Sequence, residues 1–194
     1  MRTTISIIIF LICFTGFSQK ILPKEVQIRT AVLAAPEDER AGAKVYGYSE
    51  DGKMVVLREG TNKMICIADD PEFEGISVSC YSSKLEPFMA RGRELRAEGI
   101  SEMEKRKIRQ KEVESGKLNM PDSPSTLYVF SGSEENYNRE TGELKDGKFR
   151  YVIYIPYATT ESTGPPAKPE APGMPWLMDP GTHRAHIMIS PVSN

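Results

Sequence analysis

The sequence has few cysteines, histidines and tryptophans, no excess of one charge, and no long apolar run. Of its 194 residues, 3 are Cys, 2 are His and 1 is Trp, and the formal net charge is −2. A membrane-spanning helix needs about 20 consecutive apolar residues, and the sequence has no run of that length. This excludes a multi-pass membrane protein. With a pI of about 5.8, the chain has no overall basic field, so nucleic acid is disfavoured as a partner.

The N-terminal segment has the layout of a secretory signal peptide. Arg2 supplies a positive charge, and the run from Ile5 to Phe14 is almost entirely apolar. Gly16 and Ser18 are the small residues expected just before a cleavage point. The alternative is an uncleaved anchor or a buried N-terminal strand.

We therefore divide the chain into a signal peptide, residues 1–18, and a single domain, residues 19–194. The domain is expected to be exported, either to the periplasm or to the extracellular medium. We expect no stable membrane insertion once the signal peptide has been removed.

Two cysteines remain after cleavage, Cys66 and Cys80. An exported chain with two cysteines has only one intramolecular pairing, and an oxidising compartment favours it. Closing a loop of this length stabilises a protein by about 3 kcal/mol. Two reduced, buried thiols are the alternative. A redox pair is less favoured because the cysteines are not spaced as C-x-x-C.

The hydrophobic patterning predicts an α+β fold with a mostly antiparallel sheet, a short N-terminal helix and a long charged helix. The expected helices are 24–35 and 85–115, and the expected strands are 44–49, 53–57, 64–68, 126–130, 149–155 and 186–190. The first three strands are predicted to form an antiparallel meander, and residues 69–79 a loop. Gly99 is a point where the long helix can divide. The continuous apolar strand 149–155 suggests burial on both faces.

Residues 156–180 form a proline-rich loop that holds seven of the fourteen prolines. Because proline lacks a backbone N–H, we expect this loop not to pair as sheet. The apolar residues Met174–Met178 are predicted to fold back and bury much of the Trp176 ring, while Glu161–Pro172 stays exposed. A surface cleft is expected to open toward this loop and toward His183.

Five stretches together carry a resemblance to known sequences. They are AVLAAPEDERAGAKVYGY, VVLREGTNKMICIADDP, CYSSKLEPFMARGRELRAEG, YVIYIPYATTESTG and PWLMDPGTHRAHIMI. They resemble a group of uncharacterised exported bacterial proteins, usually labelled hypothetical. The resemblance implies bacterial export and a compact domain, and it implies no activity, substrate or catalytic residue.

The two histidines are the first candidates for chemistry. Asp179, His183 and His186 have a spacing that can hold a divalent metal. If His186 begins a strand, however, the two histidines face opposite sides. A turn histidine and a strand-end histidine bound to backbone groups is the favoured interpretation, so we expect no metal and no cofactor.

Three other clusters of residues each have a functional and a structural interpretation. The acidic residues of 69–74 suit calcium, but their spacing does not match an EF-hand. The basic run within 105–111 is framed by glutamates, which is typical of a solvent-facing helix. The aromatic residues can form a binding platform or serve as core and edge residues. These aromatic residues are Tyr128, Tyr137, Tyr151, Tyr154, Tyr157 and Trp176.

Two functions are compatible with these patterns. The first is a non-catalytic domain that binds an unidentified small molecule, glycan or protein through Tyr157, Trp176, His183 and His186. The second is a cell-envelope hydrolase using His183 or His186, because a serine such as Ser131 or Ser133 can meet a histidine in space. The feature that separates them is a histidine facing a pocket with a carboxylate or hydroxyl partner.

The signal peptide gives the first testable prediction. The exported protein should begin at Gln19, because cleavage follows Ser18. Intact-mass analysis of the exported protein should show the loss of the first 18 residues. A protein that keeps Met1 and stays in the membrane fraction would contradict it.

Overall fold

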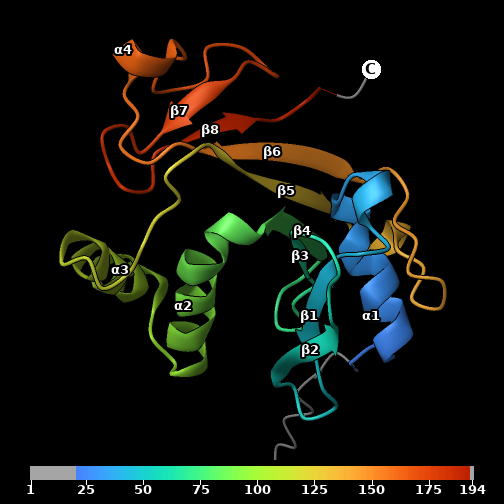
Figure 1. Ribbon diagram of the computed structural model, residues 1–194. Helices are drawn as coiled ribbons and strands as arrows, with labels where there is room; N and C mark the ends of the chain where they lie inside the picture. Colours follow the sequence, from blue (N-terminus) through green and yellow to red (C-terminus); the bar gives the residue numbers. More distant parts are fainter. Residues whose placement is uncertain (1–20, 193–194) are drawn as a thin grey trace, which may run out of the picture.

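The computed structural model describes residues 21–192, and the predicted signal peptide lies outside this range. One eight-stranded sheet runs through the protein (Figure 1). Its strands are β1 (Lys44–Tyr48), β2 (Met54–Arg58), β3 (Met64–Ile67), β4 (Ile76–Ser82), β5 (Ser125–Gly132), β6 (Lys148–Tyr154), β7 (Trp176–Met178) and β8 (His186–Ile189). The α-helices are α1 (Lys24–Ala31), α2 (Glu86–Ala97), α3 (Glu102–Glu114) and α4 (Thr160–Thr163). Short 3-10 turns are η1 (Val32–Ala34), η2 (Glu37–Glu39), η3 (Ser83–Leu85) and η4 (Glu134–Asn136).

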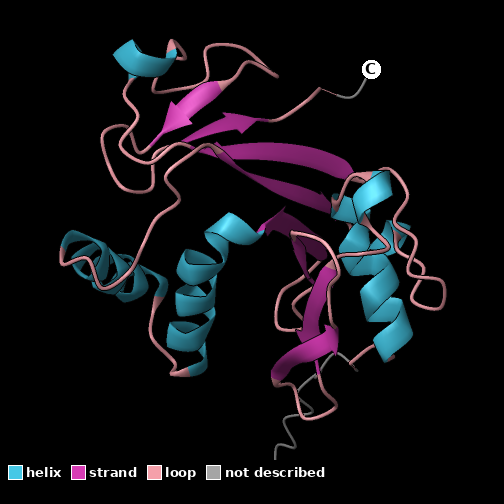
Figure 2. Ribbon diagram, viewed as in Figure 1, coloured by secondary structure: helices cyan, strands magenta, loops and turns pink. Residues whose placement is uncertain are grey.

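The strand order is β2-β1-β3-β4-β5-β6-β8-β7, and every pairing is antiparallel except that of β1 with β3. This confirms the α+β class and the mostly antiparallel sheet. Figures 1 and 2 show α1 on one side of the twisted sheet and α2 with α3 on the other. The helices therefore cover two opposite faces of the central strands.

The side chains of β3 and β4 alternate between these two faces, as the pleat of a strand requires. Cys66 and Cys80 face α1 and η1, where they pack with the buried Ala31 and Ala34. The small helix residues let the backbone approach the sheet closely. On this side the predicted helix 24–35 is confirmed, with its last turn tightened into η1.

The opposite face of the same strands packs against η3 and α2. Ile65 and Tyr81 form a cluster there with the fully buried Leu85. Pro87, near the start of α2, has no backbone N–H to leave unpaired in the first turn, so it suits a helix start. The centre of the protein is thus a helix–sheet–helix sandwich.

The predicted three-stranded meander is wrong in one respect: β3 pairs with β1 in parallel and does not pair with β2. After β2 the chain crosses over the beginning of β1, where Gly42 O accepts the N–H groups of Thr61 and Asn62. At Gly60 a Cβ atom would lie 2.7 Å from Lys44 N, so this crossing needs glycine. Gly60 and Asn62 indicate a reversal of the chain, but they do not encode which side of β1 the next strand joins.

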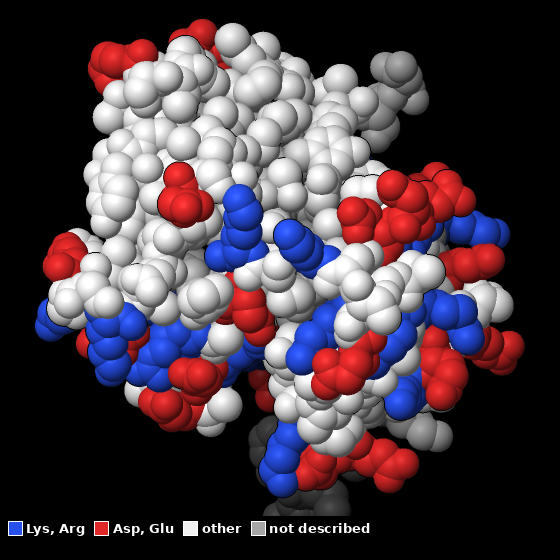
Figure 3. Space-filling view, in the orientation of Figure 1, with Lys and Arg blue, Asp and Glu red and all other residues white. Residues whose placement is uncertain are grey.

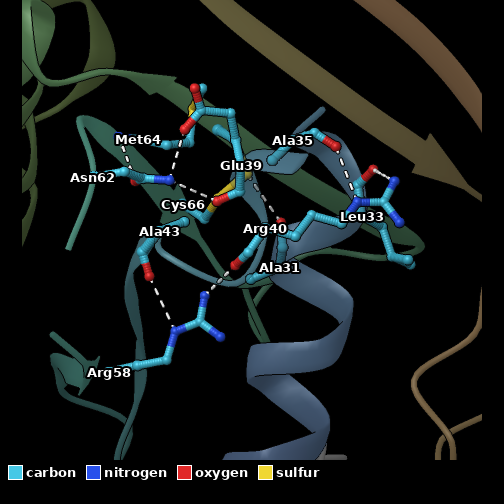
Figure 4. Close-up of a disulfide and its surroundings, with 11 residues drawn as sticks. Ala31, Leu33, Ala35, Glu39, Arg40, Ala43, Arg58, Asn62, Met64 and Cys66 are labelled. Atoms are coloured by element: carbon cyan, nitrogen blue, oxygen red, sulfur yellow. Dashed lines mark hydrogen bonds between the residues drawn. A yellow bond between two sulfur atoms is a disulfide. The ribbon is translucent and has the colours of Figure 1, made fainter. Parts of the chain in front are cut away.

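Two arginines bind backbone carbonyl groups around the connection between α1 and β1 (Figure 4). Arg40 donates to the carbonyls of Ala35 and Leu33, at 3.0 and 3.1 Å. Arg58 donates to Ala43 O at 3.0 Å and to the carbonyl of Arg40 at 2.6 Å. These bonds bind four carbonyl groups around the α1–β1 connection, beside the buried disulfide.

The predicted long helix 85–115 is two helices, divided where the sequence indicated. Gly99 has a φ of +76°, a left-handed conformation that glycine adopts without strain and that ends α2. Ser101 then caps α3 by accepting the N–H of Glu104. The residues of α3 that are most buried are charged, Lys105 and Glu112. An ion pair between Arg91 and Glu112 joins the two helices.

Two strand predictions also need correction. The predicted loop 69–79 already contains the first half of β4, because Ile76 and Val78 alternate with serines and are buried. The sequence suggests that β6 is buried on both faces, but among its residues only Val152 is buried. Its other apolar side chains are half-exposed.

The proline-rich loop 156–180 forms more structure than the sequence predicts. Trp176–Met178 is strand β7, which pairs with β8, so the prediction that no part of this loop joins the sheet is wrong. An edge strand of three residues fits between the prolines because Pro175 precedes it and Pro180 follows it. Leu177 is fully buried, Trp176 is half-buried and Met174 is 39 % exposed, so the segment folds back with Leu177 as its anchor.

Charged side chains are distributed unevenly over the surface. In Figure 3 they gather on the lower half of the view, and few lie over β6, β7, β8 and α4. The sequence explains this, because 151–160 and 185–192 contain no charged residue. Within residues 21–192, none of the helices has the length and apolar character that crossing a membrane would require.

The predicted disulfide is confirmed, since Cys66 and Cys80 are bonded across the β3–β4 pair with their Cα atoms 4.0 Å apart. Replacing both residues with alanine should lower the free energy of unfolding by about 2–4 kcal/mol, because the unfolded chain loses a cross-link. Urea denaturation of the oxidised protein and of the variant measures this difference. A variant as stable as the oxidised protein would contradict it.

Candidate functional site

A surface cleft of about 440 Å³ lies between the end of α3 and the end of β6. One wall is Val113 with the segment after α3, residues 116–124, and the opposite wall is Ile155–Tyr157. Leu118 and Pro121 are the buried residues of the first wall. Small-molecule sites commonly have volumes of about 300–1,000 Å³, so the cleft has the size of a ligand site.

The second wall of the cleft is a tight turn formed by Ile155-Pro156-Tyr157-Ala158. The N–H of Ala158 donates to Ile155 O at 3.0 Å, and Pro156 occupies the second position of the turn. Tyr157 occupies the third position with a φ of +65°. A turn with proline second and a positive φ third corresponds to type II, whose third residue is normally glycine or asparagine.

Tyr157 is therefore held in a conformation that a bulky side chain rarely adopts. Its N–H donates to Thr182 O at 2.8 Å, and Ile155 N donates to Ala185 O at 2.9 Å. These bonds fasten the turn to the β7–β8 connection and maintain the strained backbone. The phenol side chain is 58 % exposed at the cleft. Strained residues concentrate at functional sites, which makes Tyr157 the leading candidate.

His183 lies in the turn before β8, as the sequence predicts, and is 6 % exposed. Its ring packs edge-on against Phe88 of α2, with 5.9 Å between the ring centroids. Burial lowers its pKa below the ordinary value, and the charges of Arg184 and Arg109 lower it further. The atom Nε2 is enclosed and has no hydrogen-bond partner among residues 21–192, so the expectation that backbone groups bind this histidine is wrong.

His186 begins β8, and its Nδ1 lies 2.6 Å from the carbonyl oxygen of Arg184. A carbonyl can only accept, so this nitrogen carries the proton. The ring stacks on Tyr154 with 5.0 Å between centroids, and burial lowers the pKa of the imidazole. His186 is the backbone-bound strand-end histidine that the sequence favours.

The described residues do not bring the metal candidates together. No cluster of three His, Cys, Asp or Glu side chains within 21–192 can hold a metal ion. Asp179 pairs with Arg184 instead of joining a histidine. Neither histidine hydrogen-bonds to a carboxylate or a hydroxyl group in the part of the chain the structure describes, so the geometry offers no support for a catalytic histidine.

The other predicted clusters have structural partners. Asp70 and Glu72 pair with Arg96, and the carboxylate of Asp69 accepts the N–H of Ser77 at 2.7 Å. Burial raises the pKa of Asp69 to about 6. It lines a narrow cavity of about 20 Å³, which has room for little more than water.

The aromatic candidates are divided among different parts of the protein. Tyr128 and Tyr151 pack together on the α1 side of the sheet, with 6.1 Å between their centroids. Tyr137 is buried against Thr30 of α1. Trp176 lies in β7 and does not line the cleft, so of the aromatic residues weighed in the sequence only Tyr157 does.

Comparison with protein-family models, with curated proteins and with solved structures finds no match for this chain. The resemblance to uncharacterised exported proteins stays an expectation.

The sequence predicts Tyr157 as a site residue but gives no prediction for the opposite wall of the cleft, around Leu118 and Pro121. The pair Pro121 and Pro124 is the available signal, because two prolines between a helix and a strand are typical of a segment that folds as neither. The expected opening toward His183 is not found, since His183 does not line this cleft.

The buried histidine generates a pH prediction. The unfolded chain takes up a proton near the ordinary pKa of 6.5, whereas folded His183 does so only at lower pH. Stability from this group is therefore complete above about pH 6.5 and is lost as the pH falls. Replacing His183 with leucine should make the variant gain stability relative to wild type on acidification, measured by urea denaturation across the pH range.

Asp69 provides the opposite control. Its folded pKa of about 6 is raised, so it stabilises the folded protein most when it is protonated. Asp69→Asn should therefore lose stability relative to wild type on acidification. Parallel trends in the two variants would contradict the assignment.

Proposed function

We propose that the protein is an exported, non-catalytic binding domain whose ligand lies in the cleft beside Tyr157. The observation that carries this proposal is the tyrosine itself, a large aromatic side chain kept exposed at a cleft by a turn that disfavours it. Glycine or asparagine would adopt the positive φ of this position at a lower cost in free energy. Selection for stability alone therefore gives no reason to keep a tyrosine here.

The chemistry of the cleft indicates what the ligand resembles. Val113, Leu118 and Met120 supply apolar surface, and the phenol ring offers a flat face with a polar tip. Asp122 is the charged residue among those lining it, and its carboxylate accepts a hydrogen bond from Ser123. We infer a small, largely neutral ligand with a flat or apolar part, such as a sugar unit or a short peptide segment.

Replacement of Tyr157 with glycine separates binding from folding. The glycine variant should be more stable than Tyr157→Ala by about 1 kcal/mol, because only glycine relieves the positive φ. Both variants should lose ligand binding, since both lack the ring. Thermal shift against cell-wall sugars and short peptides identifies a ligand, and calorimetry then measures its affinity.

Phe73 provides the matched control. It is 62 % exposed, belongs to the loop before β4 and does not line the cleft. Phe73→Ala should retain the affinity of wild type. A ligand that binds wild type and Tyr157→Gly equally well, or that loses affinity in Phe73→Ala instead, would contradict the proposal.

A further inference from the structure

Arg109 of α3 is held in an unusual position against α2. Its guanidinium lies over the ring of Phe88, 4.1 Å from the centroid, and Nη1 donates to the backbone carbonyl of Phe88 at 3.3 Å. A Cβ atom at Gly92 would lie 3.0 Å from Nη1. Glycine within a helix is destabilising, and here it leaves room for the guanidinium. Two features of α2 therefore accommodate this side chain.

The charge of Arg109 is not neutralised by the protein. Among residues 21–192 no carboxylate forms an ion pair with it, and its Nε is enclosed without an acceptor. Glu102, the acidic residue whose charge acts on Arg109, pairs with Lys105, and Asp179, whose charge acts on His183, pairs with Arg184. Glu114, the other carboxylate whose charge acts on His183, accepts a hydrogen bond from Gln110 at 2.8 Å. Arg109 is half-buried, and burying a cation without a counter-ion costs free energy. We therefore expect an anionic hydrogen-bond acceptor to bind the guanidinium.

His183 is a second polar group without a partner on the same aromatic ring. It is 6 % exposed, its Nε2 is enclosed and unpaired, and its ring meets the edge of Phe88. Nδ1 has no hydrogen bond in the described chain either, so Nε2 is free to carry the proton and donate. Arg109 from α3 and His183 from the β7–β8 turn thus present two unsatisfied groups around one residue of α2.

We propose that Arg109 and His183 form a binding site for an oxyanion, a carboxylate or a phosphate group. The planar guanidinium offers parallel donors that match such a group, and the imidazole offers one more. The helix that carries Arg109, α3, has charged groups as its most buried residues and is joined to α2 by the Arg91–Glu112 ion pair. An anion bound here restores the charge balance under the helix.

This site is distinct from the cleft but adjoins it. Val113, which lines the cleft, follows Arg109 by one helical turn and lies on the same side of α3. On the other side Thr182, next to His183, accepts the hydrogen bond from Tyr157 N. Tyr157 is not part of this site, so an anion can bind here even if the cleft binds no ligand.

The test measures the thermal midpoint in inorganic phosphate against chloride at matched ionic strength and neutral pH. Wild type should be stabilised by phosphate, and Arg109→Met should not, because methionine keeps the apolar stem without the charge. Arg106→Met, on the exposed side of the same helix, is the matched control and should respond as wild type does. The same measurement in acetate shows whether a single carboxylate stabilises the protein. Stabilisation by phosphate but not by acetate would identify the bound group as a phosphate.

A second measurement follows the site directly in the unaltered protein. The NMR signal of the Arg109 Nε–H group should move on titration with phosphate, and so should those of the His183 ring. Gly92→Ala should weaken phosphate binding about tenfold or more, because the added Cβ crowds Nη1. Equal stabilisation of wild type, Arg109→Met and Arg106→Met, or no movement of these signals, would overturn the proposal.

Discussion

The packing of helices on both faces of the β3–β4 pair is the interaction on which the rest of the structure depends. Cys66 and Cys80 face α1, whereas Ile65 and Tyr81 face η3 and α2, so adjacent residues of the same strands form two separate cores. The disulfide joins the two strands at their centre. β1 and β5 then extend the sheet in opposite directions from this pair.

The candidate sites lie where this core ends. The turn at Tyr157 tolerates a strained backbone because hydrogen bonds from Ile155 and Tyr157 fasten it to the β7–β8 connection. α3 is different, because it adds little apolar surface to either core and meets α2 through charged groups. Such contacts stabilise less than apolar burial does, so α3 and residues 116–124 are expected to open at a lower free energy than the sheet. The wall formed by Ile155–Tyr157 is thus rigid, and the opposite wall, Val113 with residues 116–124, is expected to open more easily.

Local patterns in the sequence predicted much of this fold. The division at Gly99 follows from the cost of glycine within a helix, and the strand at His186 follows from its apolar pattern. The Cys66–Cys80 pairing follows from the presence of only two cysteines after the predicted cleavage. The parallel pairing of β3 with β1 did not, because it depends on which side of β1 the chain crosses. β7 was missed because the prolines around it dominate its composition. The position of Arg109 without a carboxylate partner could not be predicted either. The sequence of the basic run does not show which of its residues is enclosed, because that depends on how α2 packs against α3.

The central claim is that the disulfide-linked β3–β4 pair, covered by helices on both faces, forms the stable core, and that α3 and residues 116–124 can open separately. Native-state hydrogen exchange in increasing denaturant tests this claim. The backbone amides of β3, β4 and β5 should exchange only through global unfolding. Helices cover both faces of β3 and β4, and β5 is paired with a strand on each side. The amides of α3 and residues 116–124 should exchange through local opening, at a distinctly lower free energy. If the amides of α3 are protected as strongly as those of β4, the claim that α3 is a separable wall of the cleft is contradicted.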